Sequence, residues 1–493
     1  MNYKNEYNSY INESKKFIPV IIDNNYIINR SPTGGKDGDS HSIEYSFGIC
    51  GLDVSKTDMS NLTVENFAKL SFDTNTIFSE EQLKKFHPIE LLEKGKIFGL
   101  GIEKLHKAGI TGEGVQIAII DEPFDIDTPE MKNIEYAYED SRIPDQYKKV
   151  DNMHGRTVTS LLHSISPKAT INFHAVQVIE QTEESTKEIN SKRKEILDEC
   201  LKSDENVSVI SMSASIGEEE TSKYDEMLDS KKICFVNSDS LHKYFTYAER
   251  DGLNDKIKAK RVSVNKEKFE KYKKTSLEML PEMKLEYEKI KDKNSKNKLQ
   301  KLINTVTACL NIKTPVEMSD FLTEQKDEEL KRQGKILIPN GGETYPQIGG
   351  GYKYNGVPSM SWTIPQLSGM LALAKQMDKN ISYYEFVEVS KITAIINEEG
   401  FLIINPEGIV RKINQINKQK ACENPQIYTE IYEKSNKLIS NLDRVKDEEN
   451  KDNKFISELK GKVVNKEDVP KQFIQSEENE LSKEKIKYDQ QEI

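Results

Sequence analysis

A nearly all-apolar run that ends in a single carboxylate is the feature of this chain that most restricts its fold. Residues 115–120 read V-Q-I-A-I-I, and Asp121 follows them directly. Runs of this kind are typical of strands that are buried on both faces of a parallel sheet. Open α/β sheets form their sites beyond the carboxyl ends of such strands. We therefore predict a central strand at Val115–Ile120, with Asp121 at the edge of the sheet where a site would form.

Similar apolar runs alternate with helical patterns through much of the chain. This alternation predicts an α/β fold, with a mostly parallel sheet, helices on both of its faces and right-handed crossovers. A glycine-rich stretch from Asn340 to Tyr354 is predicted to be a loop. The further strands are predicted at Thr170–Val178, Val207–Ser213, Lys232–Asn237, Lys335–Pro339 and Phe401–Asn405.

The 493 residues divide by composition into three regions. Residues 1–98 form an N-terminal extension, residues 99–415 the main domain, and residues 416–493 a charged tail, predicted to be partly helical and partly disordered. Within the main domain, residues 243–333 are rich in Lys and Glu and are predicted to be a helical insertion. This insertion has two interpretations, a docking surface for a partner protein and a solvated helical face.

Charge and composition exclude several classes of function. The net charge of −11 argues against a general binder of nucleic acids or anionic membranes. The N-terminus lacks the apolar core of a secretory signal, and no apolar run is long enough to span a membrane. The five cysteines are widely separated, which fits reduced thiols better than a disulfide framework. We therefore predict a soluble cytoplasmic protein with no nucleic-acid or membrane partner.

A histidine and a serine stand at the start of two further helical patterns. His154 lies in D-N-M-H-G-R-T-V-T-S-L-L, and Ser361 lies in V-P-S-M-S-W-T-I-P-Q-L-S-G. With Asp121, the chain order is Asp, His, Ser, which is one of the orders known for the serine triad. A serine hydroxyl attacks poorly unless a neighbouring base takes its proton, and a carboxylate orients that base. These three residue types therefore indicate nucleophilic chemistry.

The same stretches resemble the subtilisin-like serine protease family, peptidase family S8, and more narrowly its signal-less branch in spore-forming bacteria. H-K-A-G-I-T-G-E-G-V-Q-I-A-I-I-D resembles the approach to the catalytic aspartate of that family, and H-G-R-T-V-T-S-L-L resembles its histidine helix. S-M-S-W-T-I-P-Q-L-S-G resembles its G-T-S-M-A-x-P-x-x-x-G serine helix. The resemblance covers roughly residues 99–405, without the insertion. It implies a subtilisin-like fold and an intracellular endopeptidase that hydrolyses peptides or proteins through an acyl-enzyme.

The resemblance also implies a role for each site residue. Asp121 would orient the imidazole, His154 would act as general base and then general acid, and Ser361 would be the nucleophile. Asn237, at the end of the I-C-F-V strand, would donate a hydrogen bond to the oxyanion. The substrate groove would be lined by Ser213, Ala214, Ser215 and Gly217 after the V-I-S-M-S strand, and by Asn340–Gly342.

Two serines compete for the role of nucleophile. Ser359 and the methionine after it copy the Ser-Met pair of the family motif, whereas Ser361 keeps the family's spacing to Pro365 and Gly369. Proline and glycine determine where a helix starts and how closely it packs, so spacing is the better guide. We therefore favour Ser361.

The flanks of the three motifs depart from the family pattern and leave alternatives open. Glu122 follows the aspartate where the family has Ser or Thr, and Arg156 replaces the Thr after His-Gly. A catalytically silent pseudoprotease that holds peptides as a regulatory scaffold is therefore the alternative function. Residues 1–98 are either a cleaved pro-segment or an integral extension. Calcium often stabilises the family, but no Asp-rich loop has calcium-ligand spacing, so no cofactor is predicted.

Overall fold

The computed structural model covers the main domain, much of the N-terminal extension and the first part of the tail. The residues that it describes are 20–21, 48–60, 62–122, 134–139, 153–176, 183–202, 207–250, 257–259, 262, 264–346 and 351–462.

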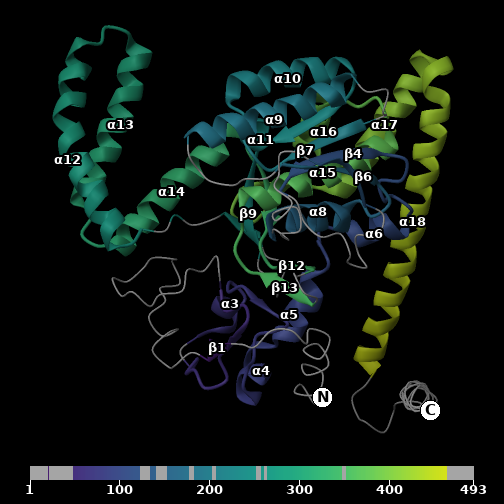
Figure 1. Cartoon of the computed structure of the whole chain (residues 1–493), viewed down its shortest axis with the longest axis horizontal. Helices are drawn as coiled ribbons and strands as arrows, with labels where there is room; N and C mark the ends of the chain where they lie inside the picture. The colour runs from purple at the N-terminus through teal and green to yellow at the C-terminus, as the bar shows by residue number, and fades with distance from the viewer. Residues whose placement is uncertain are drawn as a thin grey trace.

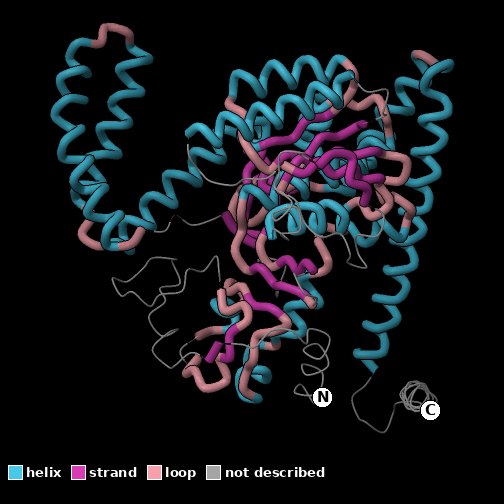
Figure 2. Tube along the Cα trace, viewed as in Figure 1, coloured by secondary structure: helices cyan, strands magenta, loops and turns pink. Residues whose placement is uncertain are grey.

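A five-stranded parallel sheet forms the centre of the main domain (Figures 1 and 2). Its order is β5-β6-β4-β7-β8, and every neighbouring pair is parallel. The strands are β4 (Gln116–Asp121), β5 (Ile134–Glu139), β6 (Thr170–Ala175), β7 (Val207–Met212) and β8 (Cys234–Asn237). The predicted α/β class is confirmed, while β5 is a strand that the sequence analysis did not predict.

Alternate residues of β4 pack on opposite faces of this sheet. Ile117 and Ile119 belong to the core cluster formed with α8 (Met153–Ile165) and α15 (Met360–Met377). Ala118 and Ile120 belong to a second cluster on the other face. That cluster is formed with α9 (Glu183–Lys202) and α10 (Glu218–Ser230). Helices therefore cover both faces, which explains why the run at 115–120 is apolar at almost every position.

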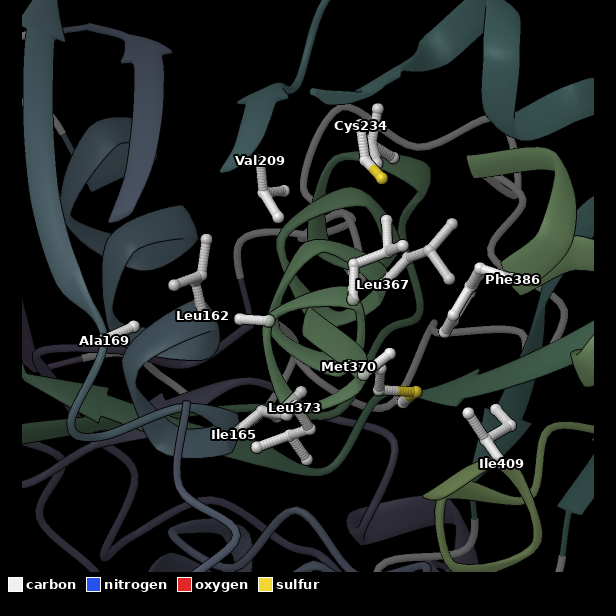
Figure 3. Packing of buried hydrophobic residues seen from close by; sticks show 14 of the residues in the cluster. Leu162, Ile165, Ala169, Val209, Cys234, Leu367, Met370, Leu373, Phe386 and Ile409 are labelled. Carbon is white, nitrogen blue, oxygen red and sulfur yellow. The ribbon is translucent and has the colours of Figure 1, made fainter. Parts of the chain in front are cut away.

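Helix α15 is the buried centre of the molecule (Figure 3). Every residue from Trp362 to Met377 is buried, because the sequence is apolar or small around most of the circumference of the helix. Gly369 allows close packing against α8, since a Cβ there would lie 2.9 Å from the Cβ of Ile165. Three more helices surround this core: α6 (Ile102–Lys107), α11 (Ser238–Tyr244) and α16 (Tyr383–Thr393).

A second sheet of five strands continues the main domain in the order β10-β9-β11-β15-β14. Its inner pairs, β9–β11 and β11–β15, are parallel, and both outer pairs are antiparallel. The strands are β9 (Phe245–Arg250), β10 (Ile257–Ala259), β11 (Ile336–Asn340), β14 (Ile395–Ile396) and β15 (Leu402–Ile403).

The N-terminal extension and the segment before α15 build one small sheet together. β3 (Phe72–Asp73) pairs with β13 (Tyr352–Asn355), which pairs with β12 (Glu343–Pro346), both in antiparallel register. The prediction that residues 340–354 form a loop is therefore wrong for β12 and most of β13. The remaining elements of the extension are β1 (Val20–Ile21), β2 (Leu52–Asp53), α3 (Val64–Phe67), α4 (Glu80–Phe86) and α5 (Pro88–Gly95).

Three helices of the Lys- and Glu-rich segment form an arm that projects from the main domain (Figure 1). They are α12 (Lys266–Lys289), α13 (Lys293–Asn311) and α14 (Pro315–Gln333). The arm has small apolar clusters of its own, and Leu330 of α14 packs against the apolar cluster of the second sheet. Strand β9, however, lies inside the range predicted for the insertion and is a central strand of the second sheet.

Two long helices close the described part of the chain, α17 (Pro406–Glu423) and α18 (Pro425–Lys462). They pack against each other, and α18 also contacts α6, where Glu449 pairs with Lys104 at 2.7 Å. Residues 463–493 of the predicted tail lie outside the described residues. Among the described helices, none combines the length and the apolar character needed to cross a bilayer.

Candidate active site

The last residue of β4 and the first turn of α8 bring a carboxylate and an imidazole into contact. Oδ1 of Asp121 lies 2.7 Å from Nδ1 of His154, although 33 positions separate the two residues in the chain. The Asp121 side chain is 4% exposed and the His154 side chain is 28% exposed. Asp121 Oδ1 also accepts the N–H of Glu122 at 2.8 Å. A buried carboxylate that binds Nδ1 orients the imidazole, so the opposite ring nitrogen, Nε2, points away from the carboxylate.

The charges around His154 favour its protonated form. Burial lowers the pKa of the imidazole, but the attraction and the hydrogen bond of Asp121, with further attraction from Glu122, outweigh burial and raise it to about 9. Burial and the neighbouring Asp121 also raise the pKa of Glu122. Among the described residues, no three His, Cys, Asp or Glu side chains gather as a metal site would require.

The first turn of α15 lies beside this pair. The indole of Trp362, the residue after Ser361, is 5.3 Å from the His154 ring, centroid to centroid. Ser361 and Ser359 are both half-buried. The Ser359 hydroxyl caps the helix and accepts the N–H of Ser361 at 3.3 Å. The Ser361 hydroxyl forms no hydrogen bond to any described residue, so the two serines have different surroundings.

Asn340, the last residue of β11, holds the start of α15 in place. Its Oδ1 accepts the Ser359 N–H at 2.9 Å, and its Nδ2 donates to the Ser359 carbonyl at 2.6 Å. Nδ2 also donates to Oγ1 of Thr363 at 2.5 Å. The side chain is fully buried, so it does not line a groove as the sequence analysis expected. In the sequence, a polar amide after a buried apolar strand was the sign that Asn340 could be functional. Its partner, Ser359, lies far away along the chain, so the sequence did not show what the amide binds.

Asn237 does not leave its amide free for a substrate, contrary to the expectation from sequence. The residue is fully buried and caps α11, where its Oδ1 accepts the Ser240 N–H at 2.8 Å. Its Nδ2 donates to Thr221 at 2.8 Å and to Asp239 at 3.4 Å. The physical reason is local: a helix begins directly after the strand, at Ser238, so the amide is used as an N-cap.

The residues predicted to line the substrate groove lie in the loop after β7, and this loop forms hydrogen bonds with neighbouring helices. Ser213 donates through Oγ to the Ser361 carbonyl at 2.9 Å, which joins the end of β7 to the start of α15. The Ala214 carbonyl accepts the Ser238 N–H at 3.1 Å, and the Ser215 hydroxyl donates to Asp239 at 2.8 Å. Gly217 is exposed and has a positive φ of 94°, which glycine adopts without steric cost.

Comparisons with known proteins give distant similarities among solved structures. No family model and no curated protein matches the chain. The prenylagaramide maturation protease PagA matches with a TM-score of 0.36 and 11% identity, over 64% of this chain and 98% of that one. The PatG macrocyclase domain matches with a TM-score of 0.36 and 12% identity, over 64% and 94%. The chain is likewise similar to a lanthipeptide protease, with a TM-score of 0.34 and 12% identity over 65% and 96%.

Proposed function

We propose that this protein is a serine-type endopeptidase that hydrolyses peptide bonds through an acyl-enzyme. The observation that carries the proposal is the 2.7 Å contact between buried Asp121 and His154, beside the first turn of the helix that holds Ser361. The surroundings of the three residues support the proposal. Asp121 is sealed from water, His154 is partly accessible, and the Ser361 hydroxyl has no competing partner among the described residues.

The chemistry follows from these positions. Asp121 accepts the hydrogen on Nδ1 of His154, which leaves Nε2 unprotonated in the neutral ring. When a peptide binds, Nε2 takes the Ser361 proton and Oγ bonds to the carbonyl carbon. The tetrahedral intermediate then collapses, the C–N bond breaks, and Nε2 returns the proton to the leaving amine. Water repeats the two steps on the ester and releases the acid. Catalytic hydrogen bonds are often loose before substrate binds, which fits a Ser361 hydroxyl that has no hydrogen-bond partner among the described residues.

The developing oxyanion needs donors other than Asn237. The first-turn N–H groups of α15 carry the partial positive charge of a helix start, and they lie at the position where Ser361 would react. We propose that the Ser361 N–H supplies one of these donors, because its bond to Ser359 is long at 3.3 Å. Asn340 would support this arrangement indirectly, since it fixes both backbone polar groups of Ser359.

The N-terminal extension is better explained as an integral part of the enzyme than as a cleaved pro-segment. Phe72 of β3 stacks on Tyr354 of β13 with ring centroids 4.9 Å apart, and both side chains are fully buried. Removal of residues 48–98 would take Phe72 away, expose the Tyr354 ring and leave β13 as an unpaired edge of the small sheet.

Covalent labelling of the full-length protein with a fluorophosphonate probe tests the proposed function. The probe reacts with serines that a neighbouring base activates, so we expect one labelled site at Ser361 after proteolysis and mass spectrometry. Denatured protein serves as the control and should not react. Folded protein that remains unlabelled, or that is labelled at Ser359, would contradict the assignment of Ser361.

The pH dependence of kcat/KM provides a second test. His154 must be neutral to accept a proton, and its pKa is raised to about 9, so kcat/KM should rise with pH well above the range of a free histidine. Glu122→Gln removes one of the charges that raise this pKa, and the rise should move to lower pH. Glu113→Gln is the matched control, because Glu113 is exposed and precedes β4, whereas Glu122 follows it. Equal profiles for all three proteins would show that Glu122 does not act on the base.

A further inference from the structure

A carboxyl group that the proposed mechanism does not use is buried next to α15. Glu343, the first residue of β12, is 3% exposed. Its Oε1 accepts two hydrogen bonds, from the N–H of Gly341 at 2.7 Å and from Nε2 of Gln366 at 2.9 Å. Gln366 belongs to α15, lies five positions after Ser361 and is fully buried. Glu343 therefore joins the turn after β11 to the helix that carries the proposed nucleophile.

The other two oxygens of this pair have no hydrogen-bond partner among the described residues. Oε2 of Glu343 and Oε1 of Gln366 are both sealed from solvent and form no hydrogen bond with any described residue. An ionised carboxylate can only accept hydrogen bonds, so it would leave both oxygens unsatisfied, which is costly in a buried place. A protonated carboxyl group carries one O–H on Oε2. That hydrogen can be donated to Gln366 Oε1, and the acid and the amide then form two hydrogen bonds in a closed ring.

We infer that Glu343 acts as a neutral carboxylic acid that positions the first turns of α15, and with them Ser361, through paired hydrogen bonds with Gln366. This inference deepens the proposed function and rests on it for the role of Ser361. The acid–amide pair itself depends only on the buried contacts, so it can be tested separately.

The surroundings of Glu343 are consistent with a neutral acid. Burial, the largest influence, raises the pKa of Glu343 to about 7, although Arg250 and the two N–H donors act to lower it. Arg250 comes from β9. The other elements that pack against β12 are α5, α8 and β13, and their acidic and basic side chains are Glu90, Glu93 and Lys94 of α5, His154, buried Arg156 and His163 of α8, and Lys353 of β13.

The sign of the pH effect follows from linkage. Because the folded-state pKa is raised above the value of about 4.5 in an unfolded chain, the native protein holds this proton more tightly. The contribution of Glu343 to stability is therefore complete below pH 4.5 and is lost as pH rises through about 7. Above that pH a carboxylate faces the Gln366 oxygen, and the packing of β12 against α15 weakens.

Glu343→Gln tests the inference, because the amide of the introduced glutamine has nearly the shape of the protonated acid and offers an acceptor and a donor at the same two positions, with one further N–H. We expect the unfolding free energies of wild type and Glu343→Gln to agree at about pH 4, below the unfolded-state pKa, and the variant to become progressively more stable than wild type from about pH 4.5 to about pH 7. Glu385→Gln is the control of opposite sign. The Ser382 N–H and Lys420 outweigh burial and lower the pKa of Glu385, so its loss should destabilise the protein toward higher pH.

Turnover separates a positioning role from a merely structural one. Glu343→Ala removes both hydrogen bonds to Gln366, and a displacement of the nucleophile by about 1 Å costs on the order of 10²-fold in rate. We expect Glu343→Ala to lower kcat by roughly 10- to 100-fold with little change in KM, and Glu343→Gln to keep wild-type kcat.

Three outcomes overturn the inference. They are a Glu343→Gln protein that is less stable than wild type at pH 5, parallel pH curves for the two proteins, and unchanged kcat in Glu343→Ala. A wild-type protein without fluorophosphonate labelling, but with the expected stability curves, would instead reject the peptidase and leave the acid–amide pair standing.

Discussion

Replacing Ser361 by alanine is expected to lower kcat/KM for peptide hydrolysis by about 10⁴- to 10⁶-fold, with the fold unchanged. The substitution removes the nucleophile and leaves no polar group unpaired, because the Ser361 hydroxyl has no hydrogen-bond partner among the described residues. The structural contact of this residue is its carbonyl, which accepts the Ser213 hydroxyl at 2.9 Å and is kept by alanine. Cleavage of a quenched-fluorescent peptide library by both proteins measures the loss of activity. Thermal unfolding of both proteins checks that the fold is unchanged.

Ser359→Ala is the matched control for this experiment. Ser359 lies two positions away and is equally half-buried, but its hydroxyl caps α15. Loss of such a cap costs about 0.5–2 kcal/mol of stability. We therefore expect Ser359→Ala to melt earlier and to retain most of its activity, the reverse of Ser361→Ala. If wild type and Ser361→Ala behaved alike in every cleavage assay, the peptidase would be rejected in favour of a pseudoprotease scaffold.

Asp121→Asn is expected to lower kcat by about 10⁴-fold. Oδ1 of Asp121 contacts both the Glu122 N–H and Nδ1 of His154, and an asparagine NH2 group at this position would donate to Nδ1 and favour the tautomer that carries its hydrogen on Nε2. That tautomer cannot accept the serine proton. Asp121→Asn also removes the strongest attraction for the imidazolium, so the remaining activity should appear at lower pH.

The control for Asp121→Asn makes the same change away from the site. Asp198 lies on α9 and accepts the Tyr224 hydroxyl at 3.0 Å. Asp198→Asn should retain activity within a few-fold of wild type. A profile of kcat against pH for the three proteins distinguishes the outcomes. If Asp121→Asn kept a tenth or more of wild-type kcat, the orienting role of Asp121 would be wrong.

The α/β fold was largely predictable because its strands are buried on both faces. A run such as V-Q-I-A-I-I is stable in few environments other than the interior of a parallel sheet. A helix that is apolar on nearly all sides must lie at the centre of the hydrophobic core. The small sheet was not predictable in the same way. Glu343–Pro346 has neither an apolar run nor a clear alternation, and it becomes a strand only by pairing with β13. Secondary structure that depends on distant partners leaves little local signal.

The sequence by itself determined which residues could form a site. Asp121 ends a buried strand, and His154 and Ser361 stand in the first turns of helices, because short-range patterns specify where those elements begin and end. Tertiary structure alone decided what each polar group contacts. In the folded protein the Asn237 amide caps a helix, and Asn340 binds the backbone of Ser359. Glu343 accepts a hydrogen bond from Gln366. The reason is that a hydrogen bond forms between groups that meet in space, and segments far apart in the chain meet only after the core has packed.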